Sequence, residues 1–288
     1  MPSSSRFAAQ RRARETVMFS LLRLAALINL LALLGVCAFL FRNGFSSLSW
    51  ELISQPPRDA MTAGGVLPCM IGTALLALGA LLISFPLGVA SAVYLHEYAG
   101  DSAFAGYVRL GVNNLAGVPS VVFGLFGLSF FVLTCGFGIS LLSGVLTLVI
   151  LTLPVIISTA EEALRQVPAD FRQASLALGA TRSQTILRVV LPAAMPGMCT
   201  GAILGLARAA GETAAIMFTG AVFFTTKGVN SIFSPVMALP NHIYVLATSG
   251  TEIDKTMPLQ YGTALLLFLL ILLLNLTAVC IRDRRQSG

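Results

Sequence analysis

The sequence predicts an all-α polytopic membrane protein with six transmembrane helices. Of its 288 residues, 56% are hydrophobic and only 10% are charged, and the mean hydropathy is +0.87. These values lie well outside the range of soluble domains. Apolar stretches of about 20 residues or more, the length that an α-helix needs to cross a bilayer, recur along the chain. Basic residues gather in alternate connections, which is the distribution that the positive-inside rule describes.

The first span is predicted over residues 17–41, after a basic tail over residues 1–16 that we expect to be cytoplasmic and without secondary structure. The pair Arg11-Arg12 in this tail also suggests a twin-arginine export signal. The apolar run behind it is too long for such a signal and lacks a small-residue cleavage site, so we expect a retained helix. Arg23 lies near the inner end of the span, from which its long side chain reaches the headgroups.

The second span is predicted over residues 67–94. It follows an outer segment over residues 42–65, which is rich in Pro and Gly and is therefore expected to be irregular. Pro86 is expected to kink the span. Residues 96–102 form an inner connection to the third span.

The third span is predicted over residues 110–134. Gly and Pro interrupt its first half, which implies close packing or a broken helix that lines a cavity. Asn113, Asn114 and Ser120 lie in this half. Their polar groups either line a pathway or satisfy neighbouring backbone groups, and the sequence leaves both interpretations open.

The fourth span is predicted over residues 139–159, after a tight outer turn at residues 135–138. Beyond the fifth span, an outer segment covers residues 223–260 and the sixth span covers residues 262–281. The sixth span is the most uniformly apolar, so we expect it at the lipid edge. Residues 17–281 thus form one six-helix domain, and residues 282–288 form a second cytoplasmic tail.

A charged loop, residues 161–192, connects the fourth and fifth spans. Pro168 suits the first turn of a helix, and Gly179 suits the left-handed residue that ends it. Between them, three apolar residues recur at steps of three and four and form a narrow stripe: Phe171, Ala174 and Leu178. Thr181 and Gln184 have the spacing of a capping box, so a second helix is predicted from there towards Leu191, with Pro192 ending it. The stripe offers a docking face either to another soluble protein or to the chain's own domain.

The fifth span is predicted over residues 193–221. Small residues follow one another at four-residue steps, which predicts the close approach of another helix: Gly197, Gly201, Gly205, Ala209 and Thr213. Arg208 and Glu212 lie one turn apart on the neighbouring ridge. Charges at the centre of a membrane helix cost about 2.5–3.5 kcal/mol each on insertion scales. Either the two residues neutralise each other, or Arg208 binds an anion during transport. In the second case Glu212 positions Arg208 and keeps the anion from binding too tightly to be released.

The basic residues place the N-terminus inside. Twelve arginines then fall on the inner side: Arg6, Arg11, Arg12, Arg14, Arg109, Arg165, Arg172, Arg182, Arg188, Arg282, Arg284 and Arg285. Four basic residues fall outside: Arg42, Arg58, Lys227 and Lys255. Both termini and the charged loop are therefore predicted to be cytoplasmic. The net charge of +6 reflects this placement rather than a nucleic-acid partner.

The charged loop resembles the EAA loop of ABC-importer permeases. Gln173-Ala174-Ser175, Gly179 and Leu191-Pro192 have the spacing of that motif. The resemblance implies that this coupling loop inserts into a cleft on an ATP-hydrolysing subunit, through seven residues: Phe171, Gln173, Ala174, Leu178, Gly179, Leu191 and Pro192. Gln173 stands where the family most often has Glu, so a family salt bridge to the ATPase is not carried over.

The stretch from Arg208 to Ala215 resembles the R-x-x-G-E-T-A motif of phosphate-importer permeases, in which the Arg and the Glu are implicated in phosphate passage. Residues 54–65, 113–127 and 239–247 are similar to the same family, and the last of these is more similar to the PstA-type than to the PstC-type permeases. The resemblance implies the type I ABC-importer permease fold in a bacterial or archaeal plasma membrane. It also implies a substrate pathway lined by Arg208, Glu212, Thr213, Asn114 and Ser120.

Family membership would bring three kinds of partner: a PstC-type permease, PstB-type ATPases and a PstS-type phosphate-binding protein. The chain has no G-x-x-x-x-G-K-[ST] motif, so any ATPase is expected to be a separate subunit. No catalytic residues, metal site or cofactor are predicted, which disfavours a membrane enzyme. An importer for molybdate, sulfate or phosphonate is the nearest alternative. An ion-coupled carrier is disfavoured because it needs no docking loop and usually shows an internal repeat. Cys69 and Cys135 both fall on the predicted outer side, where a disulfide is an open alternative to two free thiols.

Overall fold

The computed structural model describes residues 3–61, 63–100, 102–225, 229–249 and 253–286, and it is mainly helical. Five helical stretches are long and apolar enough to cross a membrane: Arg14–Ser47, Leu67–Tyr98, Leu141–Arg165, Arg182–Gly211 and Thr256–Cys280. A further pair, Ala103–Ala116 with Ser120–Thr134, passes the same test together but is bent by 102°. Counted as one span, this pair brings the total to the six that the sequence predicts. It also confirms that the third span is broken.

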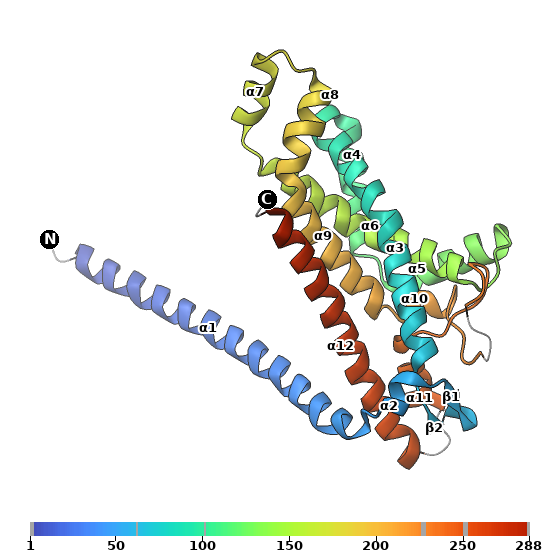
Figure 1. The fold of residues 1–288 in the computed structure, drawn as a ribbon. Coiled ribbons are helices and arrows are strands. Elements are labelled where there is room, and N and C mark those ends of the chain that lie inside the picture. Colours follow the sequence, from blue (N-terminus) through green and yellow to red (C-terminus); the bar gives the residue numbers. More distant parts are fainter. Residues whose placement is uncertain (1–2, 62, 101, 226–228, 250–252, 287–288) are drawn as a thin grey trace.

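Three helices pack side by side at the centre of the molecule: α3 (Leu67–Val93), α6 (Leu141–Arg165) and α9 (Leu191–Gly211) (Figure 1). Their shared apolar core includes Leu76, Leu148 and Leu206. Each of these residues is at most 4% exposed. Of the five long apolar stretches, those that contain these three helices are the most buried within the described chain, so they form the frame that positions the other elements.

The small-residue ridge of α9 packs against α6, as predicted. A side-chain carbon added at Gly197 would lie 2.6 Å from the Cβ atom of Ala163, and one added at Gly201 would overlap the hydroxyl of Thr159. At Gly205 the added atom would lie 3.3 Å from Ile156. The two backbones approach this closely only because these positions lack a side chain.

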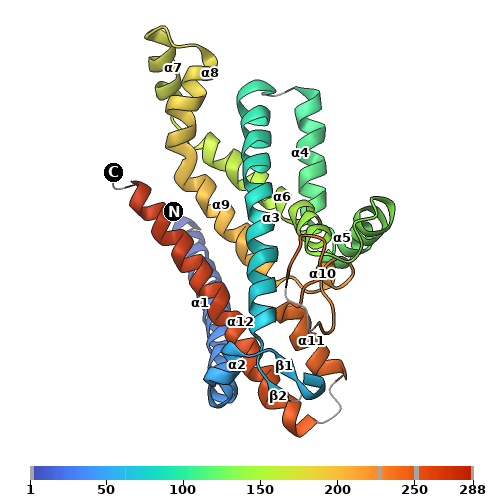
Figure 2. The same cartoon turned by 45° about the vertical axis from the view of Figure 1, so that its right-hand side comes forward.

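The first and last helices are at the edge of the bundle. α12 (Ile253–Gln286) packs against α9 over much of its length, whereas α1 (Ser3–Gly44) leans away from the body and meets α12 near one end (Figures 1 and 2). The Phe39 and Tyr261 rings are 5.5 Å apart at that contact. From Val17 to Val36 the apolar side chains of α1 are exposed, so this part of the helix packs on no other element of the described chain.

The two ends of the bundle differ in character. One end carries α7 (Ala169–Ala177) and α8 (Arg182–Thr185), and we call it the loop end. The opposite end carries α2 (Trp50–Ser54), the antiparallel pair β1 (Pro57–Arg58) and β2 (Ala63–Gly64), and α11 (Leu239–Ser249), and we call it the hairpin end (Figure 2). Short 3-10 turns η1 (Phe45–Ser47) and η2 (Asp59–Met61) flank these elements. The segment at residues 42–65, expected to be irregular, therefore contains short regular elements.

The remaining elements form the broken third span and its approach. η3 (Tyr94–Tyr98) is a π-turn that continues α3, and α4 (Ala103–Ala116) then runs alongside α6. After the break come α5 (Ser120–Gly127) and a second π-turn, η4 (Leu128–Thr134).

The loop that follows α10 (Ala214–Met217) caps the first turn of α6. The backbone N–H groups of Leu141 and Leu142 donate to the carbonyls of Ser234 and Ile232, each at 2.9 Å. Lys227, which is predicted to lie on the outer side, falls outside the described residues. Cys69 is buried and Cys135 is exposed, and both are free thiols.

Two predicted helix boundaries near the chain start and the charged loop are wrong. The tail before residue 17 is helical from Ser3, because its Ala, Arg and Gln residues are strong helix formers that extend an existing helix at little cost. The fourth span runs on to Arg165 rather than ending near residue 159. Its extra turn places Glu161 opposite Arg109, at 2.7 Å, and this ion pair compensates the buried carboxylate.

The prediction that Pro192 ends a helix is also wrong. α8, the π-turn η5 (Ile186–Val190) and α9 form one continuous helical stretch, with Pro192 in the first turn of α9. The N–H of Leu191 donates to the carbonyl of Ile186, five residues back. This wider turn accommodates a proline, which has no N–H to donate and whose ring crowds the carbonyl four residues before it.

The fifth span ends earlier than predicted. α9 stops at Gly211, and Glu212 is extended, with φ −73° and ψ 131°. Thr213 then starts the short helix α10. Gly211 and Thr213 are weak helix formers, and the Glu212 carboxylate accepts a hydrogen bond from the N–H of Ala215 at 3.3 Å. The side chain thus offers the backbone a local alternative to a continuous helix.

Candidate translocation pathway and coupling loop

The coupling loop begins with the short helix that the sequence predicts. α7 follows Pro168, carries Asp170 in its first turn and ends before Gly179. Gly179 has φ +82°, the left-handed conformation that only glycine adopts at little cost. Thr181 and Gln184 form both hydrogen bonds of a capping box at the start of α8. These three local predictions are confirmed.

The apolar stripe of α7 does not fold onto the chain's own domain. Leu178 is 89% exposed and Phe171 is 51% exposed, and Ala174 and Gln173 are exposed as well. Further along, Pro192 is exposed and Leu191 is half-buried. The helix that carries this exposed stripe, α7, lies at the loop end of the molecule (Figure 1). Of the two alternatives left open by the sequence, this geometry favours a face that docks another protein.

Arg208 and Glu212 do not form the predicted pair at one helical turn. Both residues are half-buried. Arg208 lies in the last turn of α9, whereas Glu212 lies beyond its end and caps α10. Within the described residues, no ion pair joins the two side chains. The two charges are therefore not neutralised by a direct ion pair between them.

The break in the fifth span packs against the second half of the third span. A side-chain carbon added at Gly124 of α5 would lie 3.0 Å from the carbonyl of Ala214 and 3.0 Å from the Cα atom of Ala215. Two interrupted spans thus meet directly, with Glu212 and Thr213 just before the contact. Non-helical backbone at membrane depth occurs where it is buried in protein or lines a wet cavity, and half-helix ends of this kind often form ion and substrate sites.

The two remaining predicted pathway residues lie on either side of the bend in the third span. Asn114 is exposed near the end of α4, and Ser120 is the half-buried first residue of α5. Thr213 is also half-buried, at the start of α10. The fold brings α5 and α10 together, whereas Asn114 stays on the exposed surface of α4.

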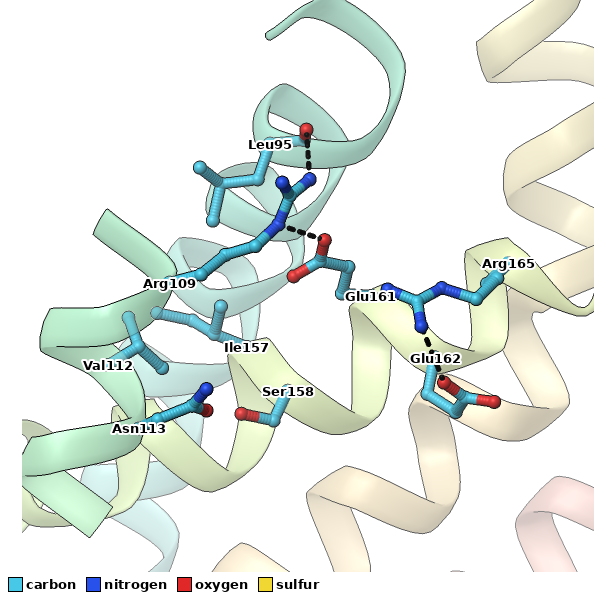
Figure 3. A pocket seen from close by; sticks show the side chains of 9 residues that line it. All are labelled: Leu95, Arg109, Val112, Asn113, Ile157, Ser158, Glu161, Glu162 and Arg165. Atoms are coloured by element: carbon cyan, nitrogen blue, oxygen red, sulfur yellow. Dashed lines mark hydrogen bonds and ion pairs between the residues drawn. The ribbon is translucent and has the colours of Figure 1, made fainter. Parts of the chain in front are cut away.

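A polar cavity between α4 and α6 was not predicted. It has a volume of about 180 Å³, and Figure 3 shows Asn113 and Ser158 on facing walls, with the Arg109–Glu161 ion pair beside them. Arg109 and Asn113 are four residues apart and so share one face of α4, a spacing that was visible in the sequence. The cavity is lined by two arginines and two glutamates, so its formal charge is balanced and it does not select an anion.

Comparison with known proteins places the chain among membrane transporters. The family described as "binding-protein-dependent transport system inner membrane component" matches residues 84–284. The probable ABC transporter permease protein YqgI of Bacillus subtilis is 34% identical, over 88% of this chain and 90% of the relative. The phosphate transport system permease protein PstA of Mycobacterium leprae is 34% identical, over 97% and 93%. A chain of a bacterial ABC transporter that imports the polysaccharide alginate has the same fold, with a TM-score of 0.61 at 13% identity over 96% of this chain and 98% of that one.

Proposed function

Because the chain belongs to the family of binding-protein-dependent transport system inner membrane components, we propose that it forms half of the translocation pathway of an ATP-driven importer for inorganic phosphate. Its relatives are multi-pass permeases of bacterial inner membranes, in which separate subunits hydrolyse ATP. The phosphate assignment is supported by PstA relatives that are 31–39% identical over most of the chain.

The observation that carries the proposal is the placement of Arg208. Its guanidinium is half-buried in the last turn of α9, and it forms no ion pair among the described residues. A guanidinium presents a planar fork of N–H donors that matches the oxygens of a phosphate. Glu212, at the break, adds a negative charge to the same region. This charge would repel the phosphate and keep binding weak enough for release.

The free stripe on α7 gives the coupling loop its proposed partner. Phe171, Ala174 and Leu178 would enter a cleft on an ATPase subunit of the PstB type, with Gly179 setting the angle of the two short helices. Docking of an ATPase requires the loop end to lie in the cytoplasm together with both termini, which is the orientation that the distribution of arginines predicts. A PstC-type permease would supply the other half of the pathway, and a PstS-type protein would deliver phosphate from outside. When the two ATPase subunits bind ATP and close, they would draw the coupling loops of the two permeases together. The pathway would then open to the outside.

The docking role predicts a specific effect of Gly179→Val. A β-branched residue is strongly disfavoured at φ +82°, so the two short helices lose their relative angle. We expect at least a tenfold loss of the ATPase that co-purifies with the tagged chain, while the chain still inserts into the membrane. Uptake should fall in parallel.

Gly136→Val is the matched control for this experiment. Gly136 has φ +70°, and no described atom lies within 4 Å of an added side-chain carbon, as at Gly179, but it lies outside the coupling loop. If both variants retain the same amount of ATPase, strain in the coupling loop does not matter for docking and this part of the proposal is wrong.

A further inference from the structure

A partly buried ion pair ties the coupling loop to the end of α3. We infer that Glu97 is a positioning residue that holds the coupling loop as one rigid unit with α3 and α6, so that a displacement of the loop reaches the membrane helices. This inference rests on the proposed docking of an ATPase on the loop, and it adds the residue through which the movement is transmitted.

The central contact joins two residues that are 75 positions apart. Glu97 lies in the π-turn η3 at the end of α3, and its side chain is 9% exposed. Arg172 of α7 donates to the same carboxylate oxygen, Oε1, through Nε at 3.2 Å and Nη2 at 2.8 Å. The Arg172 side chain is 21% exposed, so solvent and salt screen this pair much less than a surface pair.

Arg172 also binds the end of α6. Its Nη1 donates to the carbonyl of Val167 at 2.7 Å, and its Nη2 donates to the carbonyl of Leu164 at 2.9 Å. Carbonyls at the C-terminal end of a helix lack intrahelical partners and favour a cation nearby. One guanidinium therefore links α7, η3 and the end of α6.

A second arginine attaches α8 to the same π-turn. Arg182 donates to the backbone carbonyl of Glu97, and its guanidinium carbon lies 5.2 Å from the centre of the Tyr98 ring. The hydroxyls of Tyr98 and Ser183 are 3.4 Å apart. Both short helices of the coupling loop are thus held by residues 97 and 98. His96 also faces the Glu97 carboxylate, with its Nε2 3.9 Å from Oε1.

The first short helix of the coupling loop, α7, is held by few side-chain contacts besides those of Arg172. Within α7, every residue of which the structure describes, no residue is buried. Packing of apolar side chains therefore cannot hold this helix against the body of the protein. A load applied to α7 by a docked partner therefore passes through the Arg172 contacts, through the 2.9 Å hydrogen bond between the Ser175 and Thr185 hydroxyls, or through the chain itself.

The nearby pair Glu162–Arg165 is a natural control. These residues lie at the same end of the molecule, but their side chains are 56% and 64% exposed and 3.8 Å apart. A surface pair of this kind contributes little to stability. Glu162→Gln removes the same type of charge as Glu97→Gln without touching α7.

We would first measure hydrogen exchange of the full chain, co-expressed with its second permease and held in lipid nanodiscs. Glu97→Gln should raise exchange in residues 169–177 at least tenfold, with no change in the core of α6. Glu162→Gln should leave residues 169–177 as they are. Arg172→Gln should match Glu97→Gln, and combining the two should add little, because either change removes the same contact. Unchanged exchange in Glu97→Gln would overturn the inference, whatever the loop docks.

The second measurement uses the complex with its ATPase, in proteoliposomes with phosphate. Glu97→Gln should retain the ATPase but hydrolyse at least fivefold more ATP for each phosphate imported, and Arg172→Lys, which keeps the charge, should recover part of the coupling. Faster exchange with a normal ratio of ATP to phosphate would mean that the contact is only structural, and the positioning role would be wrong. If Gly179→Val leaves ATPase binding intact, the docking proposal fails separately from this result.

Discussion

Arg208→Gln is expected to lower phosphate uptake by the assembled importer at least a hundredfold, with no loss of assembled complex. A phosphate that enters the pathway loses the hydrogen bonds of its hydration water. The arginine replaces them with N–H donors and adds a positive charge. A charge-assisted contact of this kind is worth about 3 kcal/mol, which corresponds to the stated factor. Arg208 has no ion-pair partner among the described residues, so its removal leaves no buried carboxylate without compensation. Uptake of labelled phosphate in proteoliposomes, normalised to complex, measures the effect.

Glu212→Gln combined with Arg208→Gln separates transport from structure. If the two charges only compensated each other, the double variant would recover what either single change loses. We expect it to assemble normally and to remain inactive in uptake, even where its ATPase is still stimulated. Arg208→Lys should be partly active at best, because an ammonium does not reproduce the planar fork. Arg42→Gln, which removes an exposed charge at the end of α1, is the control.

Gly201→Val is expected to prevent α6 and α9 from packing. The new side chain would overlap the hydroxyl of Thr159, which is itself held by a 2.8 Å hydrogen bond to the carbonyl of Val155. Thr159 therefore cannot turn away without losing that bond, and the two helices must separate. Overpacking of this kind costs about 1–3 kcal/mol or more, a large part of the stability of a folded domain. The amount of chain that elutes as a monodisperse species should fall at least tenfold.

Gly106→Val is the matched control for this change. Gly106 is also inside a helix, but no described atom lies within 4 Å of an added side-chain carbon. The control should change stability only by the small difference in helix propensity between Gly and Val, which favours Val. Equal yields from the two variants would contradict the close packing of α9 on α6.

Features that depend on neighbouring residues were well predicted from the sequence. The spans follow from hydropathy, and the cap at Gly179 and the capping box at Thr181 follow from a few residues each. The small-residue ridge of α9 predicts that another helix approaches closely, and α6 is that helix.

Features that depend on contacts between distant parts of the chain were missed. The helix through Pro192 needs a π-turn whose cost is compensated by packing, and the sequence offers no rule for that. The break at Glu212 has local causes, but its packing against α5 joins residues that are about 90 positions apart, and no local pattern indicates that contact. Glu97 and Arg172 lie 75 residues apart, and nothing in either local pattern indicates that they meet.

The candidate site was predicted in part for the same reason. The apolar stripe was predicted because the amphipathic pattern of a single helix determines where its apolar face lies. Leu178 and Phe171 of this stripe are exposed, as a docking face requires. Arg208 and Glu212 were identified from their charge in an apolar span, but their relation was not, since it depends on where the helix ends. Asn113, rather than Asn114, faces a polar cavity, which depends on the rotation of α4 against α6.

Substrate specificity tests the central claim most directly. The chain would be co-expressed with its second permease and ATPase, reconstituted in proteoliposomes with the binding protein, and assayed for ATP-dependent uptake of labelled phosphate against excess sulfate, molybdate or a phosphonate. We predict uptake that requires ATP, is blocked only by unlabelled phosphate and is lost in Arg208→Gln. Equal or better competition by one of the other oxyanions, or uptake that continues without ATP, would contradict the assignment.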